Sequence, residues 1–299
     1  MQASTAPSAL SRPAEGLRCL LASNPSPMTQ KGTNTWLLGE GEVAVIDPGP
    51  ALPAHLASIL AALAPGERIT HIFVTHAHLD HSGLARPLAE ATGAPVLAFG
   101  DAQAGRSARM QALTAAGLVP GGEGIDADFV PDIALADGAR VSAASWALEA
   151  LHTPGHFGNH LSFLWQGCAF SGDHVMGWAS TLISPPDGDL ADYLASLDRL
   201  AAAAPARLFC GHGAPVDDPA ARIAELARHR RDRSTQILAA LAEAPCDIAT
   251  LVSRLYADTP AALHPAAARN VLAHLIDLEE NKLISSRHNP GTPRRYTLR

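Results

Sequence analysis

Three histidines and an aspartate crowd into six positions of the segment VTHAHLDHSG, residues 74–83. They follow an apolar run that is typical of a buried strand. His76 and His78 alternate in extended backbone and therefore lie on one side, and a turn through Asp80 brings His81 close to them. Imidazole nitrogens and carboxylate oxygens are ligands of divalent metals such as zinc. The spacing therefore predicts a group that holds one metal ion and begins a site for a second.

Three further ligand-type residues each follow an apolar, strand-like run and lie beside glycine. They are His156 in HTPGH, Asp173 in SGDH and His212 in CGHG. Side chains at strand ends project into one rim, where glycine allows the backbone to approach an ion closely. Because a metal ion needs at least three firm ligands, these residues supply the donors that the first cluster lacks.

The other histidines have simpler interpretations. We expect His152 to be a core or supporting histidine and His160 and His174 to be structural, with Asn159 as a candidate substrate contact. The isolated histidines are expected to be solvated or packed: His55, His71 and His229. We expect Cys210, next to a glycine, to be a core residue rather than a ligand.

The composition is that of a soluble protein with a hydrophobic core. Of the 299 residues, 47% are hydrophobic and 17% are charged, so two packed domains are expected. The net charge of −7 argues against a surface that coats nucleic acid or anionic membrane over its whole extent. No apolar run approaches the roughly 18 residues of a membrane span, and no signal-peptide pattern is present. We therefore expect a cytoplasmic protein that does not associate with membranes.

The first part of the chain predicts alternating strands and helices after a loose N-terminal tail. NTWLLGEGEVAVIDPG has the pattern of a hairpin, and a helix, a strand, a second helix and the strand PVLAF follow it. Residues 101–130 lack a clean period and predict a helix with loops that cover the site. A strand meander, a helix and the strand ARLFCGHG complete this part. The four cysteines of the whole chain show no CxxC spacing, which predicts free thiols rather than disulfides.

The character of the sequence changes at about residue 219. Residues 219–299 contain 12 Lys and Arg against 8 Asp and Glu, whereas residues 1–218 contain 10 against 21. Three helical patterns are followed by a strand LISSR, the turn NPGT and a strand RRYTLR. This order predicts a helix-turn-helix with a β-wing. We therefore predict a catalytic domain over 1–218 and a winged-helix domain over 219–299.

Taken together, HxHxDH, HTPGH, GD and GHG resemble the motifs of the metallo-β-lactamase superfamily over about residues 30–215. The resemblance implies an α/β fold in four αββα layers, followed here by the winged-helix domain. It implies that the first metal ion is bound by His76, His78 and His156. It implies that the second metal ion is bound by Asp80, His81 and His212. It also implies that Asp173 bridges both ions and that Asp47 orients the ligand loop. We name Asp80 and Asp173 as the candidate catalytic carboxylates.

The implied centre has the charge balance of a hydrolase. Two divalent ions bring four positive charges, and Asp80, Asp173 and a bridging hydroxide remove three, which leaves a centre that attracts a carbonyl or anionic oxygen. A metal ion lowers the pKa of bound water from about 15.7 to about 7, so hydroxide is available at neutral pH. Zinc accepts this mixture of nitrogen and oxygen ligands, and iron and manganese are alternatives.

Two functions fit these features. The first is a dinuclear metal-dependent hydrolase of a small ester, thioester or lactone that acts by metal-activated hydroxide. The second arises because the tail resembles the winged-helix domain of the lactamase-beta-two-like branch of the superfamily, in which some members are single-strand endoribonucleases. Single-stranded RNA is then the partner, and the basic tail is its phosphate track.

Other functions fit less well. The complete ligand set argues against a binding module with a vestigial metal site. The best-known β-lactamases of the superfamily have cysteine where this chain has Asp80, and they lack the aspartate that Asp173 matches. The acidity of the chain and its four tryptophans and three tyrosines favour a small-molecule substrate over RNA. We expect the winged-helix domain to pack on the hydrolase and form a wall of the cleft. The oligomeric state stays open.

Overall fold

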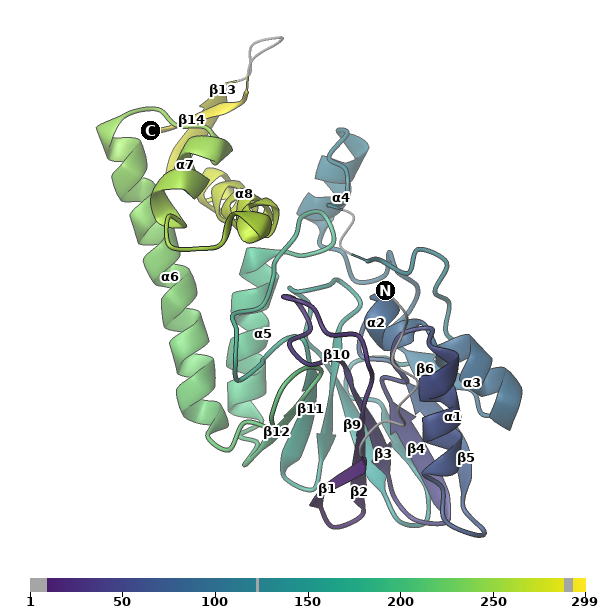
Figure 1. Cartoon of the computed structure of the whole chain (residues 1–299). Coiled ribbons are helices and arrows are strands. Elements are labelled where there is room, and N and C mark those ends of the chain that lie inside the picture. Colours follow the sequence, from purple (N-terminus) through teal and green to yellow (C-terminus); the bar gives the residue numbers. More distant parts are fainter. Residues whose placement is uncertain (1–9, 122–123, 288–292) are drawn as a thin grey trace.

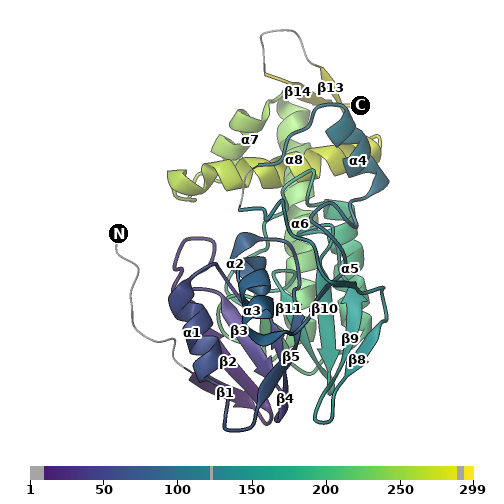
Figure 2. The ribbon, with the colours of Figure 1, turned by 90° about the vertical axis from the view of Figure 1, so that its right-hand side faces the viewer.

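The structure, a computed structural model, describes residues 10–121, 124–287 and 293–299. Two β-sheets pack face to face, and helices cover the outer face of each (Figure 1). The last two helices, α7 (Ile248–Leu255) and α8 (His264–Glu280), lie beyond one end of this sandwich (Figure 2). No helix of the described part of the chain is both long enough and apolar enough to span a membrane.

The first sheet has seven strands in chain order. They are β1 (Leu10–Ala14), β2 (Leu17–Leu21), β3 (Asn34–Leu38), β4 (Glu42–Ile46), β5 (Arg68–Phe73), β6 (Val96–Ala98) and β7 (Ile133–Ala134). The pairs from β1 to β4 are antiparallel, and those from β4 to β7 are parallel. Parallel pairing requires crossover connections, which here contain α1 (Pro53–Ala61), α2 (Leu79–Ser82), α3 (Ala85–Thr92) and α4 (Ala108–Ala115).

The second sheet has five strands in the order β12-β11-β10-β9-β8. Their bounds are β8 (Arg140–Ser142), β9 (Ala147–His152), β10 (Leu161–Trp165), β11 (Cys168–Gly172) and β12 (Leu208–Cys210). Helix α5 (Leu190–Ala202) connects β11 to β12, which pair in parallel. The predicted meander and the last strand of the catalytic part are therefore confirmed.

Period-two alternation in the strands divides the apolar side chains between separate cores. In β3, Leu37 belongs to the core beneath α1 and α3, whereas Trp36 and Leu38 belong to the core between the sheets. Phe73 and Phe163 meet across the sheets with ring centroids 5.2 Å apart. A third core lies between the second sheet and its helices. These cores confirm the predicted four αββα layers.

The expectation of a loose N-terminal tail is wrong for residues 10–21. These residues form the hairpin β1–β2, which adds two antiparallel strands to the edge of the first sheet. Leu17 and Leu20 are 1% and 2% exposed because they enter the cores on either side of the sheet. Gly16, at φ +69°, makes the turn that reverses the chain.

The C-terminal part has the predicted helix-turn-helix and wing. It contains α6 (Pro219–Glu243), α7 (Ile248–Leu255), a 3₁₀ turn (Ala261–Leu263), α8 (His264–Glu280), β13 (Ile284–Arg287) and β14 (Arg295–Leu298). The predicted NPGT turn lies outside the described residues. Helix α6 packs Ile223 in the core of the second sheet and Ile237 in the core of the winged helix. Because one helix belongs to both cores, the boundary between residues 218 and 219 stays a prediction.

Candidate metal centre

The ligand-type residues meet at one end of the two sheets. His76 and His78 follow β5, Asp173 follows β11 and His212 follows β12. His156 comes from the loop between β9 and β10. Because strands that run in the same direction end at the same edge, side chains far apart in the sequence converge there. The neighbouring helix α2 contributes the remaining two: Asp80 and His81.

Three histidines form the first donor group: His76, His78 and His156. His78 Nδ1 lies 2.9 Å from His76 Nε2 and 3.1 Å from His156 Nε2. Nitrogens bound to one tetrahedral zinc ion at about 2.05 Å are about 3.3 Å apart. The spacing of the three nitrogens therefore matches one small divalent ion.

The second donor group consists of Asp80, His81 and His212. His212 Nε2 lies 3.3 Å from His81 Nε2 and 3.2 Å from Asp80 Oδ2, and His81 Nε2 lies 3.5 Å from that oxygen. Helix α2 is what brings Asp80 and His81 to the site, where the sequence predicted a turn. These separations also match the ligands of one divalent ion.

Asp173 lies between the two donor groups. Its Oδ2 is 3.3 Å from His212 Nε2 and 3.8 Å from His156 Nε2, and its Oδ1 is 3.5 Å from His81 Nε2. The carboxylate is 7% exposed, and Oδ1 has no hydrogen-bond partner among the described residues. A buried carboxylate oxygen without a donor is costly, and a cation between the two groups would satisfy it.

The two donor groups differ in the pKa of their histidines. Burial lowers the pKa of His78 to about 3 and holds the pKa of His76 and of His156 below the ordinary value. In the second group burial is the largest effect and opposes the charged form of His212. The charge of Asp173, together with hydrogen bonds to Asp173 and Asp80, outweighs burial and raises the pKa of His212 to about 9. The first group thus presents neutral nitrogens with free lone pairs, as a metal ion requires.

Asp47 supports both donor groups, in agreement with the structural role inferred for it. Its Oδ2 accepts hydrogen bonds from the Thr75 hydroxyl at 2.8 Å and from His81 Nδ1 at 2.9 Å. The Thr75 hydroxyl in turn accepts from His76 Nδ1 at 3.0 Å. These bonds occupy Nδ1 of each ring and aim Nε2 at the donor group. The sequence analysis missed Thr75, although its place next to His76 was a signal.

His156 and His212 also point Nε2 at their donor groups, and a backbone carbonyl orients each ring. His156 Nδ1 donates to the Leu182 carbonyl at 2.7 Å, and His212 Nδ1 donates to the Gly32 carbonyl at 3.1 Å. Neither Leu182 nor Gly32 had a signal in the sequence, because every residue carries the same carbonyl group.

The histidines expected to be structural lie outside both donor groups. His152 Nε2 donates to the Gly158 carbonyl at 2.9 Å, and His160 Nδ1 bonds the Thr153 hydroxyl at 2.9 Å. Asn159, the candidate substrate contact, is fully buried. Its amide bonds three backbone groups, those of Ala77, Gly100 and Asp101. Asn159 therefore joins two loops, and its buried amide has a structural role that the sequence did not predict.

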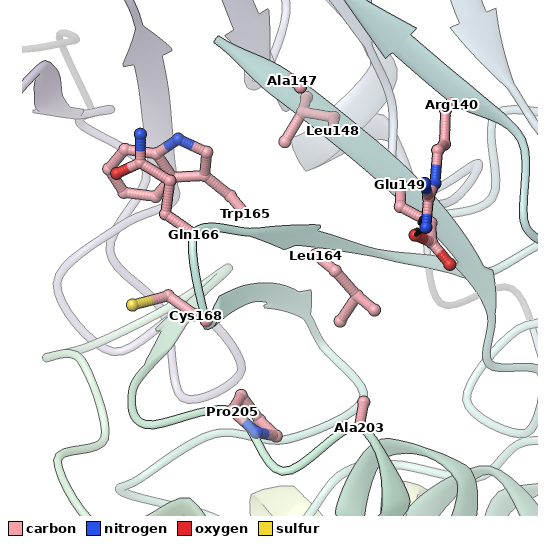
Figure 3. Close-up of a pocket in the computed structure, with 11 residues that line it drawn as sticks. Arg140, Ala147, Leu148, Glu149, Leu164, Trp165, Gln166, Cys168, Ala203 and Pro205 are labelled. Atoms are coloured by element: carbon pink, nitrogen blue, oxygen red, sulfur yellow. Dashed lines mark hydrogen bonds and ion pairs between the residues drawn. The ribbon is translucent and has the colours of Figure 1, made fainter.

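A pocket of about 350 Å³ lies at the opposite end of the second sheet, beside the turn between β10 and β11 (Figure 3). Leu164, Trp165 and Pro205 supply apolar walls, and Arg140 pairs with Glu149 at 2.7 Å on its rim. Strand β10 begins just after His160, whose ring lies next to that of His76 in the metal centre. The pocket lies at the other end of this strand, at Trp165. The pocket is therefore separate from the donor groups.

Comparison with known proteins matches this arrangement to one family. The model of the Metallo-beta-lactamase superfamily matches residues 28–212, and that of the Beta-lactamase associated winged helix domain matches residues 248–289. The Beta-lactamase-like protein 2 homolog of Drosophila melanogaster is 33% identical over 274 residues, which are 88% of each chain. The homolog of Caenorhabditis elegans is 28% identical over 281 residues, or 90% of this chain and 86% of that protein.

One solved structure has a similar fold over nearly the whole chain. The crystal structure of a metallo-beta-lactamase family protein from Thermus thermophilus aligns with 96% of this chain and 99% of its own, with a TM-score of 0.75 and 28% identity. The chain therefore belongs to the metallo-beta-lactamase superfamily of metal-dependent hydrolases and carries the winged-helix domain associated with it.

Proposed function

We propose that this chain is a dinuclear hydrolase of a small ester, thioester or lactone. The observation that supports this proposal is the pair of donor groups with the carboxylate of Asp173 between them. The donor atoms of each group are spaced like the ligands of one divalent ion. In this proposal the first donor group would hold one divalent ion and the second donor group another, with the carboxylate of Asp173 within reach of both. Asp80 and Asp173 would offset two of the four positive charges that two such ions bring.

Divalent ions bound there would supply hydroxide at neutral pH and polarise the scissile carbonyl. Zinc suits the five histidine nitrogens and two carboxylates, and iron or manganese would also fit such ligands. The protein contributes orientation: hydrogen bonds on Nδ1 fix four of the imidazole rings before substrate arrives.

The hydrogen bonds that the basic side chains of the tail make within the protein favour a small substrate over RNA. Six of its twelve cationic side chains donate to acceptors among the described residues: Arg222, Arg230, Arg233, Arg254, Arg269 and Arg295. A side chain that bonds the protein is less available to a phosphate backbone. This leaves a weak electrostatic track for RNA on an otherwise acidic chain.

A metal-dependent single-strand endoribonuclease is the second candidate. The observation that favours it is the set of exposed cations on and beside the wing, Lys282, Arg287 and Arg294. They lie on β13 and β14 or next to them, in the part of the chain that a partner could reach.

One zinc-loaded preparation assayed against thioesters, lactones, simple esters, phosphodiesters and single-stranded RNA tests both candidates. We expect turnover of a small ester-type substrate that is lost in His78→Ala. Arg287→Ala with Arg294→Ala should leave that turnover and its salt dependence unchanged. RNA cleavage by the wild type that weakens with salt, and that falls in the double arginine variant, would instead establish the nuclease.

A further inference from the structure

The segment Thr181–Ile183 lies between the winged-helix domain and the metal centre. It belongs to the long connection between β11 and α5, which contains no helix or strand from residue 173 to residue 189. On one side, the Leu182 carbonyl accepts the hydrogen bond from His156 Nδ1. On the same side, the Thr181 hydroxyl donates to the Asp173 carbonyl at 2.7 Å. One short segment therefore contacts a histidine of the first donor group and the bridging carboxylate residue.

Two side chains of the winged-helix layer hold the other side of this segment. Arg230, on α6, donates through Nη2 to the Thr181 carbonyl and through Nη1 to Asn270 Oδ1 at 3.2 Å. Asn270, on α8, accepts the Ile183 amide proton at the same Oδ1, at 3.0 Å. The backbone groups on both sides of Leu182 are thus held from α6 and α8.

The surroundings of Arg230 are unusual for a structural arginine. Arg230 is 2% exposed, and no salt bridge joins it to a carboxylate among the described residues. Its guanidinium carbon lies 5.4 Å from the ring centroid of Tyr193. A buried charge without a counter-ion is costly unless it is fully hydrogen-bonded. An arginine that only joined two domains could do so at the surface at a lower cost.

We infer that Arg230 and Asn270 are positioning residues for the first metal ion, and that the winged-helix domain is therefore part of the metal centre. They hold the 181–183 segment so that the Leu182 carbonyl keeps the His156 ring aimed at the first donor group. This inference rests on the metal assignment made for the proposed function. It adds to that function by giving the winged-helix domain a role that requires no nucleic acid.

Zinc affinity of the full chain tests this inference without any substrate. Titrations against a chromophoric chelator would be run in a His212→Ala background, where the second donor group is incomplete and the first is reported alone. Outer hydrogen bonds to metal ligands typically contribute roughly tenfold to hundredfold in affinity. We expect losses of that size in Arg230→Met and in Asn270→Ala. We expect Asn270→Asp to bind zinc more tightly than Asn270→Ala, close to the background, because aspartate keeps an acceptor oxygen for the Ile183 amide.

Arg233→Met is a matched control. Arg233 lies on the same helix, donates to a backbone carbonyl, that of Leu255, at 2.7 Å, and stacks over Tyr256 at 4.0 Å. It makes these contacts within the winged-helix domain and not with the 181–183 segment, so Arg233→Met should bind zinc as tightly as its background. Unfolding midpoints of the metal-free variants separate a loss of affinity from a loss of stability.

The outcomes are decisive for each claim. Unchanged affinity in Arg230→Met and Asn270→Ala, or an equal loss in Arg233→Met, would overturn the inference and leave the hydrolase proposal intact. If Arg230→Met does not fold, the pair Asn270→Ala and Asn270→Asp decides: equal affinities in that pair also overturn it. A wild-type chain that binds none of zinc, iron and manganese would instead overturn the proposed function itself.

Discussion

Metal binding to the second donor group should depend steeply on pH, whereas binding to the first should not. In the metal-free chain the charge of Asp173 keeps the pKa of His212 near 9, so this ring carries a proton at neutral pH. The charges of Asp80 and Asp173 raise the pKa of His81 in the same direction, against the effect of burial. Zinc requires neutral imidazole, so it must displace these protons. His78, with a pKa of about 3, has none to displace above about pH 5.

The size of this pH dependence follows from the raised pKa of His212. At pH 7, two units below the pKa of His212, protonation reduces the apparent affinity about a hundredfold, or about 2.7 kcal/mol at roughly 1.36 kcal/mol per unit. Between about pH 6 and pH 8 the affinity of the second donor group should therefore rise about tenfold per unit for each proton displaced. The affinity of the first donor group should stay constant over this range.

Calorimetric zinc titrations in two buffers of different ionisation enthalpy measure the protons released at each step. We expect the second ion to release at least one proton more than the first, because only its histidines are protonated beforehand. His212→Ala should remove the proton-releasing step and keep the other. Equal proton release at both steps, or none at either, would refute the reasoning from the paired histidines and carboxylates.

Other parts of the structure lead to three further predictions. Asp80→Ala should bind a single ion, because it removes one donor of the second group. Asp173→Ala should lose affinity for both ions, because Asp173 contacts both donor groups. Elemental analysis that finds equal zinc in wild type and Asp173→Ala would contradict this. Burial, with the charge of Asp189, raises the pKa of Asp192 from 3.8 to about 6, so ionised Asp192 destabilises the fold at neutral pH. This penalty shrinks as the pH falls below 6 and is gone only below the unfolded pKa of 3.8. Asp192→Asn should therefore raise the unfolding midpoint at about pH 7.5 and leave it nearly unchanged at about pH 3.5, and a lower midpoint at the higher pH would show that the carboxylate stabilises. Phe163→Ala, which empties a fully buried position between the sheets, should cost about 3–5 kcal/mol in the free energy of unfolding, and a loss below about 1 kcal/mol in denaturant titrations would contradict the packing.

Local patterns were sufficient for much of the fold. Alternation places Val43 and Val45 of β4 in one core and Ala44 and Ile46 in the other, and such alternation is visible in the sequence. The hairpin of residues 10–21 was missed because its first strand mixes polar residues and proline with apolar ones, so it lacks a clean period. It becomes a strand only because β2 and β3 provide an edge to pair with.

The sequence by itself determined the seven ligand-type residues, because histidines and aspartates that follow apolar runs, either clustered or beside glycine, form a local signal. Only the tertiary structure decided how these side chains are held. It selected the Leu182 carbonyl for His156, and it brought Arg230 and Asn270 from two helices of another layer to the segment that carries this carbonyl. Carbonyl groups are the same at every position in a chain, and contacts between residues 49 and 87 positions apart have no local period. Which of them meet is therefore settled only when the helices pack against the sheet.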